Sequence, residues 1–449
     1  MWDLASLERD FNAYLASLGR VAPDVAYGDV LRELETRYPF SDPQPLGAIV
    51  DDVERWMRTG ILHSNHPRYF GLFNPQVRFA SVVADLIVAA ANPQLGAWFH
   101  SPAPVEIEQH TLRFFARKFG MPDAAAHFTS GGSEANASAV LVAIERHFPE
   151  AHDEGARAIA KRPVLFASAE AHHSFDKIAQ QTGLGRGAVR IVEADEHDRI
   201  RVDVLERAVA EARRRDEAPF LVVATAGTTG TGAIDPLRGI ASVCRREGLW
   251  MHVDAAWGGA AAASPKLRPH LDGIELADSI TCDAHKWLSA PIAAGMFFTT
   301  HGDALHRAFG TDTPYVPHSQ GPEWYRESLQ WTRRFIGLKL FMALAELGEE
   351  GLARQVEQHA EIASYLRERV AAAGWTITND SPLAVVCFTN DSIDTEERCR
   401  ARADAIVRRG KCWISALIRA GKPPALRACV TNYTTSREDV DVLVDELAR

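Results

Sequence analysis

The sequence predicts an α/β protein with a mainly parallel sheet sandwiched by helices. Between residues 164 and 255, short apolar runs alternate with helical patterns, which is typical of a parallel sheet covered on both faces. Polar and ionisable residues close several of these runs, at strand ends where ligands gather in such sheets. The chain has 449 residues, of which 46% are hydrophobic. This is enough for a sizeable core and for two or three domains.

The chain is expected to have three parts, the first of which is a helical segment over residues 1–77. Leu4, Leu7 and Phe11 have the spacing of one helix face, and prolines between residues 39 and 45 interrupt the pattern. A large domain is expected over residues 78–338. A small α+β domain is expected over residues 339–449, because a long helical stretch is followed by the apolar runs LAVVCFT, CWISALI and ALRACVTN and by the helical pattern DVDVLVDELA.

The alternation inside the large domain can be followed run by run. The expected strands are VLFAS, AVRIVEAD, FLVVATAGTTG and LWMHVDA, and the helices between them are SFDKIAQQTG, RVDVLERAVAEARRR and PLRGIASVCRREG. The carboxyl ends of parallel strands meet at one edge of the sheet. We therefore expect His172, Thr228, Asp254 and Lys286 to lie near that edge.

A glycine turn precedes a helical pattern at residues 131–133. Free amide groups and the positive end of a helix dipole bind phosphate, and glycine lets the backbone approach the phosphate closely. Gly132 and Ser133 are therefore the expected phosphate contacts. The pattern alone is not specific, because many turns before helices resemble it.

An aspartate and a lysine are the last residues of two successive apolar runs. Asp254 ends the run that begins at Trp250, and Lys286 ends the run that begins at Ala277. This pair suits pyridoxal 5'-phosphate (PLP). The lysine amine would hold the cofactor aldehyde as a Schiff base, and the carboxylate would keep the pyridine nitrogen protonated so that the ring accepts electrons. Each residue alone is more often structural, since Asp and Lys are common at strand ends.

Composition narrows the class of protein. The 59 acidic residues outnumber the 49 basic ones, for a formal net charge of -10, which argues against nucleic acid or an anionic membrane as the main partner. The six cysteines are scattered without a C-x-x-C pair, so no metal site is expected. The N-terminus lacks the basic segment followed by an apolar segment that is typical of a secretory signal. No apolar run reaches the length of a membrane span. The expectation is a cytoplasmic enzyme.

The runs HVDAA, from His252, and DAHKWL, from Asp283, resemble the group II PLP-dependent decarboxylases. This is the family of aromatic amino acid, histidine, glutamate and diaminobutyrate decarboxylases. The resemblance covers nearly the whole chain and is strongest from Phe128 to Phe335. It implies fold type I with a seven-stranded sheet, PLP on Lys286, and a homodimer with shared active sites in which the N-terminal segment packs across the partner subunit.

The same resemblance implies roles for further residues around the cofactor. His172 stacks on the pyridine ring opposite the methyl group of Ala256, with a capping or surface role for His172 or His173 as the alternative. Asp283 stays outside the predicted site, because an ionised acid beside a phosphate is unfavourable. The other implied cofactor contacts are Thr228, which is otherwise a strand-end cap, and His285 and Thr332.

Residues 310–335 form a long polar loop that is expected to act as a lid. The stretch TPYVPHS in this loop resembles the family's catalytic loop, whose tyrosine reaches into the neighbouring subunit and protonates the substrate carbanion after CO₂ leaves. By resemblance, Tyr315 takes that role beside Lys286 and His172 as the catalytic residues. The alternative is a tyrosine that packs a surface loop.

Three residues are expected near the substrate: Phe73, Asn74 and His100. Asn74 stands where the aromatic amino acid branch has proline, and Gly96 stands where those enzymes have an aromatic ring. Pro75 likewise replaces the threonine that contacts the substrate carboxylate in that branch, so this contact is not expected here, and Gly96 disfavours a catechol or indole substrate. Three residues would suit a polar or acidic substrate side chain, with a surface position as the alternative for each: Arg68, Gln94 and His100.

The expected activity is decarboxylation of an L-amino acid to the corresponding amine. Other PLP carbanion reactions stay open, namely a Cα–Cβ lyase, an aldehyde-forming oxidative decarboxylase and an aminotransferase. The tyrosine at position 315 argues against aldehyde formation, because that branch tends to carry phenylalanine there. A non-catalytic PLP-fold binding protein is the last alternative, and the intact Lys286 and Asp254 argue against it.

Overall fold

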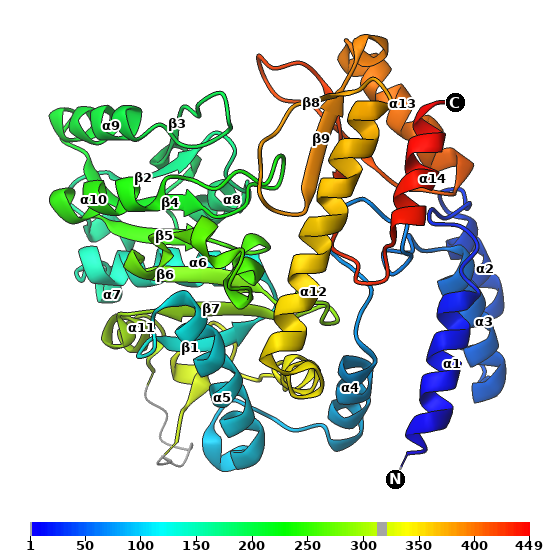
Figure 1. The fold of residues 1–449 in the computed structure, drawn as a ribbon. Helices are drawn as coiled ribbons and strands as arrows, with labels where there is room; N and C mark the ends of the chain where they lie inside the picture. The colour runs from blue at the N-terminus through cyan, green and yellow to red at the C-terminus, as the bar shows by residue number, and fades with distance from the viewer. Residues whose placement is uncertain (1, 312–320) are drawn as a thin grey trace. The chain divides into compact units, whose positions relative to one another are not determined.

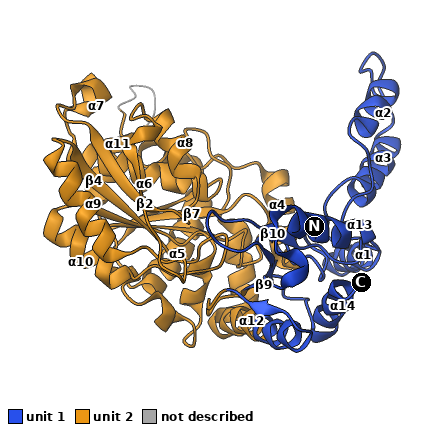
Figure 2. Ribbon diagram, turned by 90° about the horizontal axis from the view of Figure 1, so that it is seen from above, with its two compact units in different colours: residues 1–76, 362–378, 386–449 blue, residues 77–361, 379–385 orange. Residues whose placement is uncertain are grey.

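The computed structural model describes residues 2–311 and 321–449. Contacts between residues divide the chain into two compact units, which Figure 2 draws in different colours. Unit 2 comprises residues 77–361 and 379–385, and unit 1 comprises residues 1–76, 362–378 and 386–449. The division falls inside helix α12 (Leu338–Ala372), which therefore contributes to both units.

A seven-stranded sheet runs through unit 2 (Figure 1) in the order β1-β7-β6-β5-β4-β2-β3. Parallel ladders join β6 to β5, β5 to β4, β4 to β2 and β2 to β3. Strand β7 is antiparallel to both of its neighbours, β6 and β1. The strands are β1 (Ala125–Thr129), β2 (Pro163–Ser168), β3 (Val189–Val192), β4 (Ala218–Thr225), β5 (Trp250–Asp254), β6 (Ser279–Asp283) and β7 (Gly295–Thr299).

Helices connect these strands. Pro102 begins α5, where its missing amide costs no helical hydrogen bond, and Gly120 ends it with a left-handed φ of 79°. Helix α12 is interrupted at Gly348, whose φ is 65°. The other helices of unit 2 are α4 (Phe79–Ala91), α5 (Pro102–Phe119), α6 (Gly132–His147), α7 (Ala151–Glu154), α8 (Ser174–Gln181), α9 (Val202–Arg214), α10 (Leu237–Glu247) and α11 (Gly302–Phe309).

The sheet is buried on both faces. Every residue of β5 and of β6 is buried, as expected for parallel strands covered by helices on each side. On one face, Leu221 and Val223 of β4 pack in an apolar cluster with Ala139 and Val142 of α6. The alternate residue Val222 is also fully buried and points to the other face, and α9 and α10 also pack against β4.

Unit 1 combines helices with a small sheet of the order β10-β11-β9-β8. Its strands are β8 (Thr376–Ile377), β9 (Val385–Thr389), whose first residue belongs to unit 2, β10 (Ser415–Leu417) and β11 (Ala425–Cys429). The β10–β11 and β8–β9 pairs are antiparallel. A capping box between Ser436 and Asp439 begins the last helix. The helices are α1 (Leu4–Ala16), α2 (Asp29–Arg37), α3 (Leu46–Thr59), α13 (Glu396–Arg409) and α14 (Arg437–Leu447).

The predicted fold class is confirmed. The four strands expected between residues 164 and 255 are β2, β3, β4 and β5, and the expected helices are α8, α9 and α10. The division at residues 77 and 338 into three domains stays a prediction. Among the described residues, no helix has both the length and the apolar character needed to cross a bilayer.

Candidate active site

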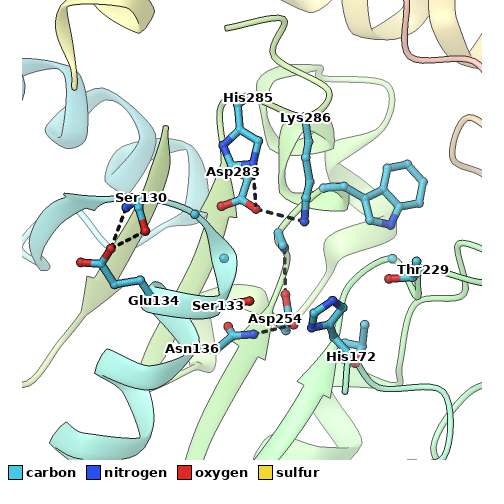
Figure 3. Close-up of a pocket in the computed structure, with 16 residues that line it drawn as sticks. Ser130, Ser133, Glu134, Asn136, His172, Thr229, Asp254, Asp283, His285 and Lys286 are labelled. Atoms are coloured by element: carbon cyan, nitrogen blue, oxygen red, sulfur yellow. Dashed lines mark hydrogen bonds and ion pairs between the residues drawn. The ribbon is translucent and has the colours of Figure 1, made fainter. Parts of the chain in front are cut away.

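A cavity of about 330 Å³ opens in unit 2 at the carboxyl ends of three neighbouring strands (Figure 3). Thr225, Asp254 and Asp283 line it and are the last residues of β4, β5 and β6. The opposite wall is the first turn of α6. The cavity falls within the size range of small-molecule sites and lies where the sequence predicts a ligand.

Two glycines form the wall at the start of α6. A Cβ atom on Gly132 would lie 2.9 Å from Asp283 Oδ2 and 3.2 Å from Ala256 Cβ, and one on Gly131 would lie 3.3 Å from His285 Cε1. A larger residue would therefore press on the far side of the cavity. The first amides of a helix have no intrahelical acceptor, so the amides of Gly132 and Ser133 are available to an anion.

Asp254 presents a fixed carboxylate to the cavity. The residue is 4% exposed. Its Oδ2 accepts a hydrogen bond from Asn136 Nδ2 at 2.9 Å, and its Oδ1 accepts one from the Ala256 amide at 3.1 Å. Because both oxygens are held, the carboxylate keeps one orientation.

Lys286 reaches into the same cavity from the turn after β6 (Figure 3). Its Nζ lies 3.0 Å from Asp283 Oδ2. Burial opposes the charged amine, but Asp283 and Asp254 outweigh it and raise the pKa of Lys286 above its ordinary value. The amine is therefore protonated at neutral pH, with Asp283 as its ion-pair partner.

Sequence reasoning missed Asp283. Its side chain is 1% exposed, and Oδ1 has no hydrogen-bond partner among the described residues. Lys286, three residues later, is brought back onto this carboxylate by the turn and offsets its repulsion from a phosphate. That spacing after a strand end is the signal that predicts the contact.

Two histidines line the cavity as neutral rings. Burial lowers the pKa of His172, although Asp254 opposes the shift, and the ring Nδ1 accepts a hydrogen bond from the Ser174 amide at 3.2 Å. Burial also lowers the pKa of His285 in spite of the nearby Asp283. The side chain of His173 is 93% exposed and does not line the cavity, which favours His172 of the two neighbours.

Several predicted contacts do not line this cavity. The hydroxyl of Thr228 is fully buried and accepts a hydrogen bond from the Ala233 amide at 3.1 Å, while its neighbour Thr229 lines the cavity. Thr332 and His100 are exposed residues outside the lining. Thr228 thus serves the turn after β4, as the capping alternative expects.

The remaining predicted residues lie elsewhere. Phe73 and Asn74 belong to unit 1, where Phe73 is buried and the Arg427 guanidinium lies 4.9 Å from its ring centroid. Tyr315 falls outside the described residues. The roles of all three stay predictions.

Asn136 is a further cavity residue that sequence reasoning missed. It lies four residues after Gly132 on α6, so both residues share one face of the helix. That spacing, once the glycine turn is identified, would have indicated Asn136. Thr229 and Trp257 line the cavity as well and were not predicted.

The residues around the cavity fit PLP. Helix amides suit a phosphate, an amine suits an aldehyde and a carboxylate suits a pyridinium nitrogen, and all three face one space (Figure 3). The two glycines leave the phosphate wall free of side chains. Within the described residues, no group of His, Cys, Asp and Glu side chains is arranged to hold a metal ion.

Comparisons with known proteins agree with this fit. Residues 28–390 match the pyridoxal-dependent decarboxylase conserved domain. The chain is 32% identical over 406 residues to the acidic amino acid decarboxylase GADL1 of Bos taurus. This match covers 86% of this chain and 77% of the relative. It is 32% identical over 408 residues to the cysteine sulfinic acid decarboxylase of Homo sapiens. This match covers 86% of this chain and 82% of the relative.

A solved structure agrees as well. The crystal structure of mouse CSAD matches with a TM-score of 0.90 and 27% identity, over 99% of this chain and 98% of that chain. Fold, cavity chemistry and sequence thus lead to one assignment. The chain belongs to the pyridoxal-dependent decarboxylase family and is a PLP-dependent carboxy-lyase that acts on an amino acid.

Proposed function

We propose that the protein decarboxylates an L-amino acid with an acidic side chain to the corresponding amine, with PLP attached to Lys286. The observation that carries the proposal is the placement of the Lys286 amine and the Asp254 carboxylate on one cavity, beside the free amides of α6. The substrate class rests on the relatives, which are named as decarboxylases of acidic amino acids and of cysteine sulfinic acid.

Each wall of the cavity would hold a different part of the cofactor. The amides of Gly132 and Ser133 would bind the phosphate. Asp254 would accept a hydrogen bond from the pyridine nitrogen and keep it protonated. His172 and the methyl group of Ala256 would cover the two faces of the ring. PLP, when bound, supplies an electron-accepting ring that takes up the charge left on the substrate Cα as CO₂ departs.

Lys286 has to be deprotonated before it can act as a nucleophile. Asp283 Oδ2, at 3.0 Å from Nζ, is placed to accept that proton. The same carboxylate would return the proton and hold the ammonium form of Lys286 whenever the amine is not bonded to the cofactor. Asp283 therefore acts as the proton partner of Lys286 in the proposed cycle.

His172 would serve the substrate carboxylate. The ring is neutral, and its Nδ1 already accepts from the Ser174 amide. The proton must then reside on Nε2, which is the ring's only donor. A donor at this place can orient the carboxylate that leaves as CO₂.

The remaining parts of the proposal rest on predictions from the sequence, among them the resemblance of TPYVPHS to the family's catalytic loop. Tyr315 is the proposed proton donor to Cα, and it would come from the partner subunit of a homodimer. A cytoplasmic location belongs to the same proposal. The residues proposed to contact substrate or cofactor by the same resemblance are Phe73, Asn74, His100 and Thr332.

The test incubates the full-length protein and PLP with L-aspartate, L-cysteine sulfinate, L-glutamate and L-tryptophan, and measures CO₂, amine, aldehyde and keto acid. We expect CO₂ and amine in equal amounts, with an acidic substrate preferred. Lys286→Ala should lose the reaction, whereas Lys161→Ala should keep it, because Lys161 is an exposed lysine paired with Asp216. Absence of CO₂ from all four, or aldehyde or keto acid as the main product, would contradict the proposal.

A further inference from the structure

We propose that Ser279, His252 and Asn136 form a buried relay of hydrogen bonds that aims Asp254 at the cofactor and keeps its carboxylate an acceptor. The three are positioning residues, since they would act on the reaction only through Asp254. The inference rests on the proposed function, in which Asp254 meets the pyridine nitrogen of PLP.

The relay runs from the start of β5 and β6 to the cavity. Trp250 Nε1 donates to Ser279 Oγ at 2.8 Å, and Ser279 Oγ lies 2.8 Å from His252 Nδ1. His252 Nε2 lies 3.0 Å from Asn136 Oδ1, and Asn136 Nδ2 donates to Asp254 Oδ2 at 2.9 Å. Trp250 is 2% exposed, Asn136 1%, and Ser279 and His252 are fully buried.

The donors and acceptors of this relay can be aligned in only one direction. A carboxylate can only accept, so Asn136 turns its amide nitrogen to Asp254 and its carbonyl oxygen to His252 Nε2. The ring proton of His252 must then be on Nε2 and point at the carbonyl oxygen of Asn136. In the neutral ring Nδ1 is then the acceptor, so the Ser279 hydroxyl donates to it and accepts from the Trp250 indole.

The relay requires a neutral His252. Burial lowers the pKa of His252 to about 4, although Asp254 opposes the shift. The ring is therefore neutral at physiological pH, with one donor and one acceptor nitrogen. If His252 were protonated, Nδ1 would donate to Ser279 Oγ instead of accepting from it, so the pattern of donors and acceptors would change at that end of the relay.

Among the described residues, not every buried polar side chain of α6 has a hydrogen-bond partner, and Ser138 is an example of one that does not. Ser138 is a fully buried residue of the same helix α6, and its hydroxyl has no hydrogen-bond partner in the described parts of the chain. Every side-chain polar atom of Ser279, His252 and Asn136 has a partner. A fully satisfied polar chain inside a core fixes one arrangement of its members, and here its last member is the carboxylate that faces the cavity.

The experiment compares full-length wild type with Asn136→Leu, His252→Phe, His252→Gln and Ser279→Ala, and uses Ser138→Ala as the matched control. Three quantities are measured for each protein: the dissociation constant of PLP, the pH at which bound cofactor changes its absorbance, and the melting temperature of the apo form. Borohydride reduction followed by peptide mass spectrometry checks that PLP still attaches to Lys286.

We expect Asn136→Leu and His252→Phe to weaken PLP binding about tenfold or more, as the loss of supporting contacts does in other sites. They should also shift the pH midpoint of the cofactor absorbance by about one unit. His252→Gln, which keeps an amide donor, should recover part of both effects, and Ser279→Ala should show a smaller loss. Ser138→Ala should match wild type in PLP affinity and in the pH midpoint.

The pH midpoint is interpretable because the neighbours of Asp254 stay in place. The titratable groups around it are Lys286, His172, Asp283, Cys282 and His252. Of these, the Asn136→Leu protein changes none. A shift in that protein therefore reports on Asp254 itself.

The outcomes separate the two proposals. If wild type does not attach PLP to Lys286, the proposed function fails. If wild type and Ser138→Ala attach PLP and the relay variants keep the wild-type affinity and pH midpoint, the relay is overturned while the proposed function stands. If Asn136→Leu does not fold, the test rests on Ser279→Ala and His252→Gln, because both proteins keep Asn136 next to Asp254. Wild-type PLP affinity and a wild-type pH midpoint in both proteins would overturn the relay.

Discussion

The amine of Lys286 lies 3.0 Å from Oδ2 of Asp283, three residues earlier in the chain. Asp283 ends β6 and is almost fully enclosed, so its charge needs a partner inside the protein. The lysine that is proposed to carry the cofactor supplies that partner. The state of the nucleophile is therefore set by a residue that would not itself be bonded to PLP.

Asp283→Asn is expected to shift the pH dependence of cofactor attachment. The change keeps the shape of the side chain and removes the charge that raises the pKa of Lys286 against burial. The amine then becomes a nucleophile at lower pH. The rate at which apo protein takes up PLP, followed by absorbance, should reach its half-maximum about one pH unit lower or more. Asp203→Asn, at an exposed acid paired with Arg201, is the control, and equal midpoints in all three proteins would contradict the ion pair.

Gly132→Ala is expected to weaken binding of the phosphate. The new Cβ would lie 2.9 Å from Asp283 Oδ2 and 3.2 Å from Ala256 Cβ, so either the Asp283 side chain or the first turn of α6 must shift. Affinity for PLP should fall about tenfold, whereas affinity for pyridoxal, which has no phosphate, should change little. Gly47→Ala is the control, because a Cβ there meets nothing within 4 Å. Equal losses for PLP and pyridoxal would show that the amides of α6 do not hold the phosphate.

His127→Leu is expected to stabilise the protein, and more so in acid. Both ring nitrogens are buried without a partner in the described structure, and burial lowers the pKa of His127 to about 3. Below pH 6.5 the unfolded chain binds a proton that the folded chain does not bind until about pH 3. Wild type therefore loses free energy of unfolding through His127 as the pH falls from 6.5 towards 3, whereas His127→Leu does not.

The measurement for His127→Leu is the free energy of unfolding at two pH values. The gain over wild type should be larger at pH 5 than at pH 7.5, by about 2 kcal/mol. His173→Leu, at a side chain that is 93% exposed, should show no such difference. An equal gain at both pH values would mean that the folded protein accepts the proton.

Tyr315→Phe is expected to reduce amine formation more than CO₂ release. The phenol would protonate Cα after CO₂ leaves, and phenylalanine cannot donate that proton. The amount of amine formed per CO₂ should therefore fall below one, and aldehyde and ammonia, formed with dissolved O₂ as the oxidant, should make up the difference. Tyr27→Phe, at a fully exposed residue, serves as the control. An unchanged ratio with an unchanged rate would remove Tyr315 from the mechanism.

Most elements of the fold could be predicted from local sequence patterns. The apolar runs of β2 to β5 and the helices between them were predictable because buried parallel strands require continuous apolar sequence. Asp254 and Lys286 were predictable because both close such runs. The insertion of the antiparallel β7 between β6 and β1 was not, since strand order depends on pairings between distant parts of the chain.

The site was predictable in part, for a related reason. Thr228 and Thr229 differ by one position, and a hydrogen bond between the Thr228 hydroxyl and the Ala233 amide decides which of them faces the cavity. The contact between Asn136 and Asp254 joins residues 118 positions apart. The four-residue spacing from Gly132 indicates that Asn136 faces the cavity, but its contact with Asp254 depends on how α6 packs on the sheet.

The central claim is that Lys286 carries PLP, and borohydride reduction of the PLP-loaded protein followed by peptide mass spectrometry tests it most directly. The account predicts one modified peptide, with the pyridoxyl group on Lys286, and loss of that peptide when excess substrate amine is present before reduction. A pyridoxyl group on another lysine, or none at all in protein that binds PLP, would contradict it.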